Sequence, residues 1–360
     1  MRRNPAANPG RAAGERVTRK PTQKRTGQSA LDVPSVTAKS PSVTLIGTGN
    51  WGTALALALH DAEIPLREIV TRRKSHSHHS LARAAGGHMT TLPDAKLDAD
   101  VLWICTPDAV ISKIAADLGA RLSAKAAAAR LRSPKTNARR IPPIVFHSSG
   151  ALGSSELAVL RTVEASVASV HPLMTFPQPS IPQKNRPERQ LASVPFAIEG
   201  DPRACRAARK LVQALGGEAF ALSARNKTLY HAFGAFISPL LVAVLTAATE
   251  TAAAAGYTPV QARRRMQLII ERTLANFFAA GPQKSFSGPI ARGDVATIAR
   301  HLDALRPHPR LEALYRELSR YALHSLPSRN RRQIQRLLYK PPDSPANNSA
   351  SRTRSRASTA

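Results

Sequence analysis

Residues 42–59 read Ser-Val-Thr-Leu-Ile-Gly-Thr-Gly-Asn-Trp-Gly-Thr-Ala-Leu-Ala-Leu-Ala-Leu, and this stretch decides the fold. It predicts a short apolar strand, a Gly-x-Gly-x-x-Gly turn and a helix. In a turn that binds a dinucleotide, Gly47 allows the tight bend, Gly49 lets the backbone approach a pyrophosphate, and Gly52 lets the helix pack on the sheet. An ordinary glycine turn in another α/β fold is the alternative. The predicted cofactor contacts in the turn are Gly47, Thr48, Gly49, Asn50, Trp51 and Gly52.

The residues at the tip of the second strand indicate which dinucleotide binds. A strand is expected over residues 68–71, and Arg72, Arg73 and a lysine follow it. An NAD site commonly carries Asp or Glu at this tip to bind the ribose hydroxyls, and this chain has neither. Thr71 can donate a hydroxyl hydrogen bond, and an arginine fork matches phosphate geometry. The sequence therefore predicts NADP as the cofactor, with a solvated basic loop as the alternative.

Basic residues give the 360-residue chain a formal charge of +29, but they are unevenly distributed. Residues 1–41 hold nine Lys or Arg against two acids, and residues 327–360 hold eight against one. The stretch 124–140 holds six and no acid, and it is expected to be an insertion. Residues 1–41 and 341–360 nearly lack large apolar residues, so we expect solvated, disordered tails. Because no aromatic residue interleaves with the basic ones, no specific nucleic acid is expected as a partner.

Two cysteines and one apolar run bear on location. Cys105 and Cys205 suggest no disulfide framework, which suits a reducing cytosol. The apolar run 232–248 contains Pro239, so a buried core helix is expected rather than a membrane span. Histidines cluster within 75–79, where a loop is expected, but no second cluster supplies further ligands, so no metal site is predicted. The expected location is cytoplasmic, without membrane contact.

Strand and helix patterns alternate as far as residue 222, and only helical patterns follow. Alternation of this kind predicts a parallel sheet covered by helices on both faces. The long helical pattern that begins at Asn226 is expected to break near Pro239. The predicted order is a basic tail over 1–41, a Rossmann α/β domain over 42–222, an all-helical domain over 223–328 and a second basic tail over 329–360.

This order resembles the superfamily of two-domain reductases that includes pyrroline-carboxylate, ketopantoate and prephenate-type dehydrogenases. More closely, the chain resembles a bacterial family of Rossmann-like proteins with a helical C-terminal domain of unknown function. The matching segments are Leu-Ile-Gly-Thr-Gly-Asn-Trp-Gly (45–52), Phe-His-Ser-Ser-Gly (146–150), Ser-Val-His-Pro-Leu-Met-Thr-Phe (169–176), Glu-Gly-Asp (199–201), Lys-Thr-Leu-Tyr-His-Ala (227–232) and Gly-Pro-Ile-Ala-Arg-Gly-Asp (288–294). The resemblance implies a helical domain like the C-terminal domain of 6-phosphogluconate dehydrogenase, a small-molecule substrate and a homodimer formed through that domain.

Polar residues follow three strands of the predicted sheet, where ligands of open parallel sheets bind. Cofactor contacts are predicted for Thr106 and Pro107, and substrate contacts for His147, Ser148 and Ser149. The third group is His171, which is similar to the histidine of the His-Pro-Met motif in prephenate-type dehydrogenases. The resemblance implies that His171 meets the substrate hydroxyl and moves a proton, and a structural histidine at a strand end is the alternative.

Further candidates lie in the helical domain. Lys227 and His231 are four residues apart at the start of its first helix, so they share a face. The related reductases place a catalytic lysine here, which implies that Lys227 polarises a carbonyl or imine and His231 relays the proton. A solvated first turn is the alternative. Arg292 is expected to clamp a substrate carboxylate or phosphate, while Asp294 fits either a substrate contact or a helix N-cap.

Together these residues predict an NADP-dependent oxidoreductase that transfers a hydride to or from a small carbonyl, imine or hydroxy compound. The nicotinamide carries the hydride, so the protein must orient the substrate and move one proton. A non-catalytic NADP-binding regulatory protein is the main alternative. A protein that binds nucleic acid or a membrane surface through its basic tails is a third.

Overall fold

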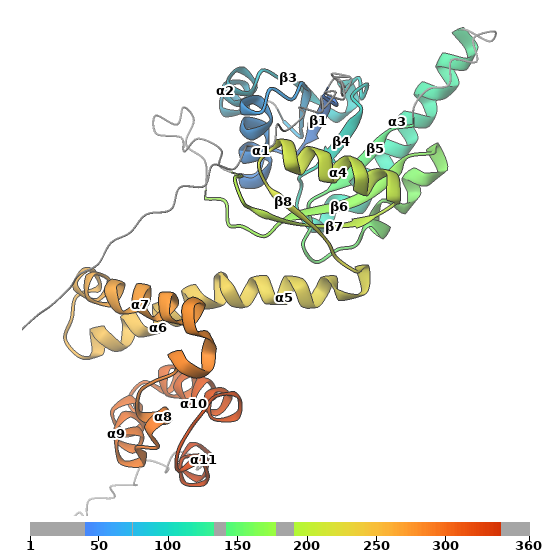
Figure 1. Cartoon of the computed structure of the whole chain (residues 1–360). Helices are drawn as coiled ribbons and strands as arrows, with labels where there is room; N and C mark the ends of the chain where they lie inside the picture. Colours follow the sequence, from blue (N-terminus) through green and yellow to red (C-terminus); the bar gives the residue numbers. More distant parts are fainter. Residues whose placement is uncertain (1–39, 74, 133–141, 178–190, 340–360) are drawn as a thin grey trace, which may run out of the picture. The chain divides into compact units, whose positions relative to one another are not determined.

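The structure is a computed structural model that describes residues 40–73, 75–132, 142–177 and 191–339 (Figure 1). By their contacts, residues 41–360 group into a single unit. Residues 1–39 of the first predicted tail (1–41) and residues 340–360 of the second (329–360) lie outside the described residues, as do residues 133–140 of the predicted insertion.

The first half of the described chain builds an eight-stranded sheet with the order β3-β2-β1-β4-β5-β6-β7-β8. The strands are β1 (Val43–Ile46), β2 (Leu66–Thr71), β3 (His88–Thr91), β4 (Val101–Ile104), β5 (Ile144–His147), β6 (Ser166–Pro172), β7 (Pro195–Gly200) and β8 (Glu218–Ala221). All neighbouring pairs are parallel except β6 and β7. The strand order reverses direction between β1 and β4, which is where a Rossmann sheet binds its dinucleotide.

Helices cover both faces of this sheet, as predicted. One apolar cluster joins the strands to α1 (Asn50–Asp61), α2 (His76–Ala85) and α4 (Pro202–Ala214). A second cluster, on residues that alternate with the first along the strands, joins α3 (Ile111–Arg132) and the 3₁₀ segment η3 (Ser154–Val163). Strands buried on both faces explain the nearly continuous apolar runs in the sequence.

The helical region follows β8, with few buried side chains in its first three helices. Its helices are α5 (Lys227–Ile237), α6 (Pro239–Ala254), α7 (Pro259–Ser285), α8 (Pro289–Arg292), α9 (Val295–Leu305), α10 (Pro309–Ser325) and α11 (Arg331–Tyr339). The predicted break before Pro239 is confirmed, because Ser238 has non-helical φ and ψ of −129° and −86°. A small apolar core includes Ile298, Leu302 and Ile334 from α9 and α11.

Several local predictions are wrong. The histidine-rich segment forms the start of α2, with Ser75 as its N-cap, instead of a loop. Helix α3 continues to Arg132 and so includes the first residues of the predicted insertion. The predicted tail from 329 contains α11, whose Ile334 and Leu338 are fully buried. His171 lies inside β6, paired with a residue of antiparallel β7, instead of after the strand.

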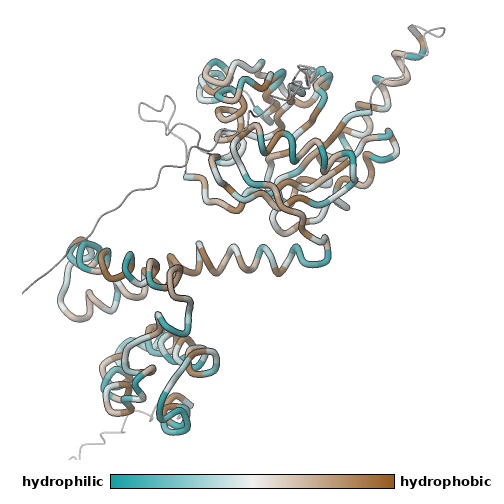
Figure 2. Tube along the Cα trace, viewed as in Figure 1, coloured by the Kyte–Doolittle hydropathy of each residue, from teal (hydrophilic) through white to brown (hydrophobic). Residues whose placement is uncertain are grey.

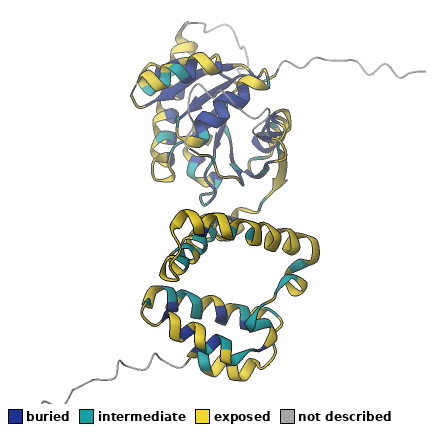
Figure 3. Ribbon diagram, turned by 90° about the vertical axis from the view of Figure 1, so that its left-hand side faces the viewer, coloured by how far each residue is buried: buried dark blue, intermediate teal, exposed yellow. Residues whose placement is uncertain are grey.

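The expectation of a buried core helix within 232–248 is also wrong. An 18-residue window within Ala224–Ala254 has a mean hydropathy of 1.9, yet none of it is buried. Figure 2 shows the brown apolar residues along α5 and α6. Figure 3 shows these helices mainly in yellow and teal, while the central strands of the sheet are dark blue. By length and composition alone, this segment is long and apolar enough to cross a membrane.

Candidate functional site

The structure gives a different reason for glycine at each of the three positions in the turn. Gly47 has a φ of +103°, and a Cβ there would lie 2.9 Å from the backbone of Cys105 at the end of β4. A Cβ on Gly52 would lie 2.1 Å from the carbonyl oxygen of Gly47, so α1 approaches β1 only with glycine there. Gly49 has an ordinary φ of −66°, and a Cβ there would meet nothing within 4 Å. The open space before the N-terminus of α1 therefore fits a pyrophosphate.

The other residues of the turn connect it to the rest of the sheet. The backbone carbonyl of Thr48 accepts a hydrogen bond from the Thr53 hydroxyl at 3.2 Å. The Asn50 side-chain amide donates to the carbonyl oxygen of Phe176 at 3.0 Å. The Trp51 ring packs against the Phe176 ring with their centroids 4.8 Å apart. The turn is thus joined to the segment that follows His171.

The tip of β2 agrees only partly with the predicted phosphate site. Arg72 and Arg73 are exposed, so both guanidinium groups are accessible to a 2′-phosphate. Thr71 is buried, and its hydroxyl donates to the carbonyl oxygen of Arg73 at 3.1 Å. Thr71 therefore shapes the loop with its hydroxyl, and the arginines are the groups free to bind phosphate.

The end of β4 presents a polar atom without a protein partner. The Thr106 hydroxyl oxygen is buried and has no hydrogen bond within the described part of the chain. Its methyl group lies against Gly47, because a Cβ on that glycine would be 2.9 Å from it. Pro107 is exposed beside it. An unpaired hydroxyl next to an open glycine turn fits a bound dinucleotide, which would supply the missing partner.

The three polar residues at the end of β5 have distinct roles. His147 is fully buried; its Nδ1 accepts from the Ser149 backbone N–H, and its Nε2 lies 3.0 Å from the carbonyl oxygen of Gly153. Ser149 donates its hydroxyl to Asp108 at 2.8 Å. Ser148, which is half-buried, accepts hydrogen bonds from two tryptophan side chains. With both ring nitrogens engaged by backbone, His147 holds the β5 turn in place and Ser148 remains the residue accessible to a ligand.

Lys227, at the start of α5, is buried at the ends of β5 and β6, with a relative exposure of 1%. Its ammonium group donates to the carbonyl oxygen of Ser149 at 2.9 Å and to the hydroxyl of Ser169 at 2.6 Å. The carboxylates of Glu199 and Asp108 act on it electrostatically. The helical region is thus joined to the carboxyl edge of the sheet through a buried cation.

His171 and His231 lie beside this lysine. The Nδ1 of His171 is 3.0 Å from the hydroxyl of Tyr230, and the two histidine rings are 6.3 Å apart. A Cβ on Gly150 would lie 2.7 Å from both His171 Nε2 and His231 Cδ2, so both rings pack on this glycine. The three predicted catalytic residues, Lys227, His171 and His231, are therefore brought together at the ends of β5 and β6.

Burial sets the charge state of this group of residues. It lowers the pKa of Lys227 to about 8, an effect that Glu199 and Asp108 partly oppose. It lowers the pKa of His171 to about 4, and the positive charge of Lys227 acts in the same direction. It raises the pKa of Tyr230 to about 12. At neutral pH the site therefore holds a lysine cation beside a neutral histidine and a neutral tyrosine.

The predicted substrate contacts in the helical region have local roles. Asp294 is the N-cap of α9 and accepts from the Thr297 backbone N–H at 3.0 Å, so the N-cap alternative is confirmed. Arg292 is exposed at the end of α8. Within the described part of the chain, neither residue forms a hydrogen bond or an ion pair with Lys227 or His171. Their contact with a substrate stays a prediction.

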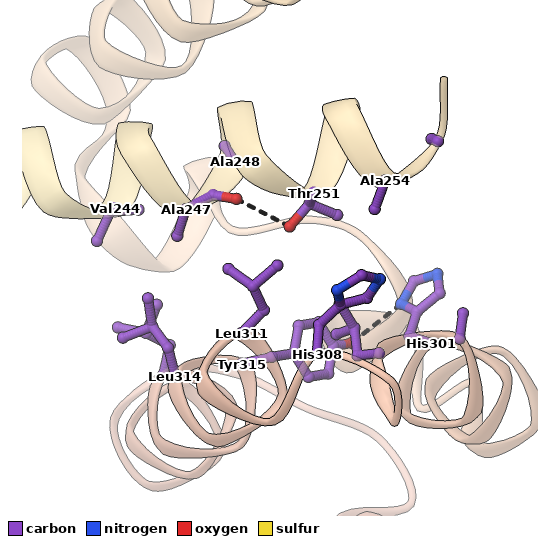
Figure 4. Close-up of a pocket in the computed structure, with 14 residues that line it drawn as sticks. Val244, Ala247, Ala248, Thr251, Ala254, His301, His308, Leu311, Leu314 and Tyr315 are labelled. Atoms are coloured by element: carbon purple, nitrogen blue, oxygen red, sulfur yellow. Dashed lines mark hydrogen bonds between the residues drawn. The ribbon is translucent and has the colours of Figure 1, made fainter. Parts of the chain in front are cut away.

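An apolar pocket of about 600 Å³ lies between α6 and the pair α9 and α10 (Figure 4). Small side chains of α6, such as Ala247 and Thr251, form one wall. At one end, His301 Nδ1 lies 3.0 Å from the hydroxyl of Tyr315. The pocket lining includes neither Lys227 nor the glycine turn, so this hollow is separate from the candidate site.

Sequence reasoning missed several members of the site. Tyr230 and Ser169 lie in the matching segments 227–232 and 169–176, but the resemblance assigns no role to either residue. They are long-range partners of His171 and Lys227. Glu199 was visible only as part of a matching segment, and it accepts from both the backbone N–H and the hydroxyl of Ser154. Within the described residues, no cluster of His, Cys, Asp and Glu could hold a metal ion.

Solved structures with this arrangement of elements are known. The protein BF3122 of Bacteroides fragilis, named as an NADP oxidoreductase, is 19% identical, with a TM-score of 0.61 over 79% of this chain and 98% of its own. The protein TM1727 of Thermotoga maritima is also 19% identical, with a TM-score of 0.56 over 82% and 99%. The imine reductase of Myxococcus stipitatus in complex with NADP⁺ is 14% identical, with a TM-score of 0.54 over 79% and 95%. At these identities the likeness shows a shared fold.

Two known domain families match parts of the chain. No curated protein sequence matches the chain. Residues 37–129 match the NADPH-binding domain of acetohydroxy acid isomeroreductase, which confirms the predicted NADP cofactor. Residues 194–322 match a domain of unknown function, DUF2520, which confirms the predicted resemblance. The chain therefore combines an NADPH-binding Rossmann domain with a DUF2520 C-terminal domain.

Proposed function

We propose that this protein is an NADP-dependent oxidoreductase that transfers a hydride to or from a small carbonyl, imine or hydroxy compound. The observation that carries the proposal is the position of Lys227. It is a buried cation at the ends of β5 and β6, and these strands belong to the same sheet as the NADPH-binding domain. The Myxococcus stipitatus relative is named an imine reductase, so an imine stands beside a carbonyl among candidate substrates.

The residues of the site suit the proton and charge changes of such a reaction. Bound NADPH supplies the hydride. Lys227 would stabilise negative charge that develops on a substrate oxygen, because its ammonium group lies in a poorly hydrated position. His171 is neutral at pH 7 and contacts Tyr230, so this pair can pass a proton between the substrate and solvent-exposed His231.

Turnover by a lysine variant tests this proposal. NADPH oxidation is measured across a panel of small ketones, keto acids and cyclic imines. Lys227→Ala is expected to slow turnover about 100-fold or more with NADPH affinity largely retained. Lys113→Ala, on the exposed side of α3, is the matched control. Equal turnover rates for Lys227→Ala and the control would show that Lys227 has no role in catalysis. Tight NADPH binding without turnover across the panel would favour the non-catalytic regulatory protein.

We further propose that the chain forms a homodimer through α5, α6 and α7. Large apolar side chains are exposed on these helices, among them Leu229 at 75%, Phe236 at 70% and Phe278 at 80%. Patches of this kind mark interfaces in soluble proteins. A second copy presents the same helices and so supplies a matching apolar face. Because Cys105 and Cys205 are free thiols, we place the dimer in the reducing cytoplasm.

A further inference from the structure

Both tryptophans of the chain donate to one hydroxyl oxygen. The indole Nε1 of Trp51 lies 2.8 Å from Ser148 Oγ, and the indole Nε1 of Trp103 lies 2.8 Å from the same atom. Trp51 belongs to the glycine turn and Trp103 to β4, while Ser148 follows β5. The glycine turn, β4 and the end of β5 thus meet at one oxygen.

The hydrogen bonds from the two indoles limit which further hydrogen bonds the Ser148 hydroxyl can form. A serine hydroxyl has two lone pairs and one proton, and an indole N–H can only donate. The two indoles therefore use both lone pairs, and only the proton of Ser148 is left. The nearest other candidate acceptor is Cys105 Sγ at 4.0 Å, which is long even for a weak sulfur acceptor. Because Ser148 is half-buried, its proton can reach a ligand.

The surroundings hold the two indoles in place. Trp103 is fully buried and packs edge-to-face on Phe146, with the ring centroids 5.2 Å apart. Trp51 packs against Phe176 and against Phe196, whose ring centroid is 5.9 Å away. Neither indole can turn away without breaking these contacts, so Ser148 is kept as a donor.

We propose that Ser148 is a donor-only recognition residue, which selects a ligand that presents an acceptor oxygen beside the end of β5. A carbonyl or carboxylate oxygen fits this chemistry, and an amide N–H or ammonium group does not. Two ligands of the site carry such an oxygen, the carboxamide of the nicotinamide and the small substrate. The inference deepens the proposed function and rests on it for the identity of the ligands.

The hydrogen-bonded state of the indoles can be tested without any ligand. Because the chain has two tryptophans, ¹⁵N labelling gives two indole N–H resonances. Ser148→Ala should shift both resonances, since both indoles lose the same acceptor. Ser80→Ala, on α2, should move neither. If Ser148→Ala shifts one resonance or none, the shared acceptor does not exist in solution and the proposal fails, whatever the protein catalyses.

Binding measurements then identify the source of the acceptor oxygen. If the acceptor oxygen belongs to the carboxamide, wild-type protein should bind NADP⁺ about three- to tenfold more tightly than thio-NADP⁺, because the sulfur of thio-NADP⁺ is a weaker acceptor. Ser148→Ala should then bind the two cofactors equally well. The 3-acetylpyridine analogue, which keeps the carbonyl and lacks the amide N–H, should bind like NADP⁺. If the oxygen belongs to the substrate, Ser148→Ala should leave NADP⁺ affinity unchanged and weaken oxalate, titrated into the NADP⁺ complex, by a similar factor.

Trp103→Phe covers the case in which Ser148→Ala does not fold. This variant keeps the hydroxyl and frees one lone pair, so the preference for an acceptor should weaken without disappearing. The proposal is overturned if Trp103→Phe and any folded Ser148→Ala bind NADP⁺, thio-NADP⁺ and oxalate with wild-type affinities. Failure of wild-type protein to bind NADP⁺ would instead contradict the proposed function, while the indole resonances would still decide the donor-only state.

Discussion

Helices α1 and α6 are both rich in alanine and leucine, but their surroundings are opposite. Eight of the twelve residues of α1 are buried, whereas α6, all of whose residues are described, buries none. Helix α1 packs on a sheet that the same chain provides, and α6 has no comparable surface within the described residues. Composition therefore predicts that a helix is apolar, but the topology decides whether its own chain covers it. Helices α5, α6 and α7 therefore present exposed apolar side chains, whereas the helices of the sheet domain bury theirs against the strands.

The largest expected effect follows from charging this uncovered face. The double variant Phe236→Asp and Ile269→Asp replaces side chains that are 70% and 66% exposed on α5 and α7. Desolvating two carboxylates in an apolar interface should weaken dimerisation about 100-fold or more. Light scattering after size-exclusion chromatography measures the change. Tyr321→Asp, 70% exposed on α10, is the control.

The molar mass of the wild-type protein in solution shows whether a second copy covers the exposed helices. A monomeric wild-type protein would show that a second copy does not cover α5 to α7. Co-sedimentation of that monomer with phosphatidylcholine vesicles would then favour a membrane surface as the covering environment, in line with the length and hydropathy of the segment.

The glycine turn offers the sharpest test of the sheet domain. Gly49→Val should lower NADPH affinity about 100-fold or more while the fold is kept, because its side chain would occupy the space for the pyrophosphate. Gly47→Ala should instead destabilise the domain, because it combines a φ of +103° with a 2.9 Å approach to Cys105. Calorimetric titration and thermal unfolding separate the two effects. Wild-type affinity in Gly49→Val would mean that the turn does not hold the cofactor.

How much of the site the sequence could predict depends on the range of its interactions. The glycine turn, the break before Pro239 and the cap at Asp294 rest on neighbouring residues, and the structure places each as its local pattern indicates. The position of His171 inside β6 depends on antiparallel pairing with β7, which no local pattern reports.

The contacts that define the chemistry are longer in range. Ser148 meets a residue 97 positions earlier, and Lys227 meets one 78 positions earlier. Lys227 and His171 could be named from a resemblance, but the hydrogen-bond partners of their side chains could not. Tyr230 was hidden for the same reason, since its role depends on the side chain opposite it.

Buried His147 provides a test of the Rossmann core by pH. Burial lowers its pKa from 6.5 to about 4, so the unfolded chain binds a proton more readily than the folded one. The stabilisation of the folded state by neutral His147 is fully present above pH 6.5 and is lost as the pH falls toward 4. The loss in the free energy of unfolding is about 3 kcal/mol at most. In urea unfolding, the free energy of unfolding of His147→Asn should fall less between pH 6.5 and pH 4 than that of the wild-type protein. His324→Asn, on exposed α10, should retain the wild-type pH dependence; a His147→Asn profile that matches it would contradict the assignment.

The smallest expected effect concerns cofactor choice at the tip of β2. NADPH should bind about tenfold more tightly than NADH, because a charge-assisted contact from Arg72 or Arg73 to the 2′-phosphate is lost with NADH. Both side chains are exposed, so water and salt weaken the contact and keep the preference modest. Replacing both arginines with alanine should bring the two affinities together and leave NADH binding unchanged. Calorimetry at low and high salt measures this, and a preference that survives both the double replacement and high salt would place the 2′-phosphate contact on other residues.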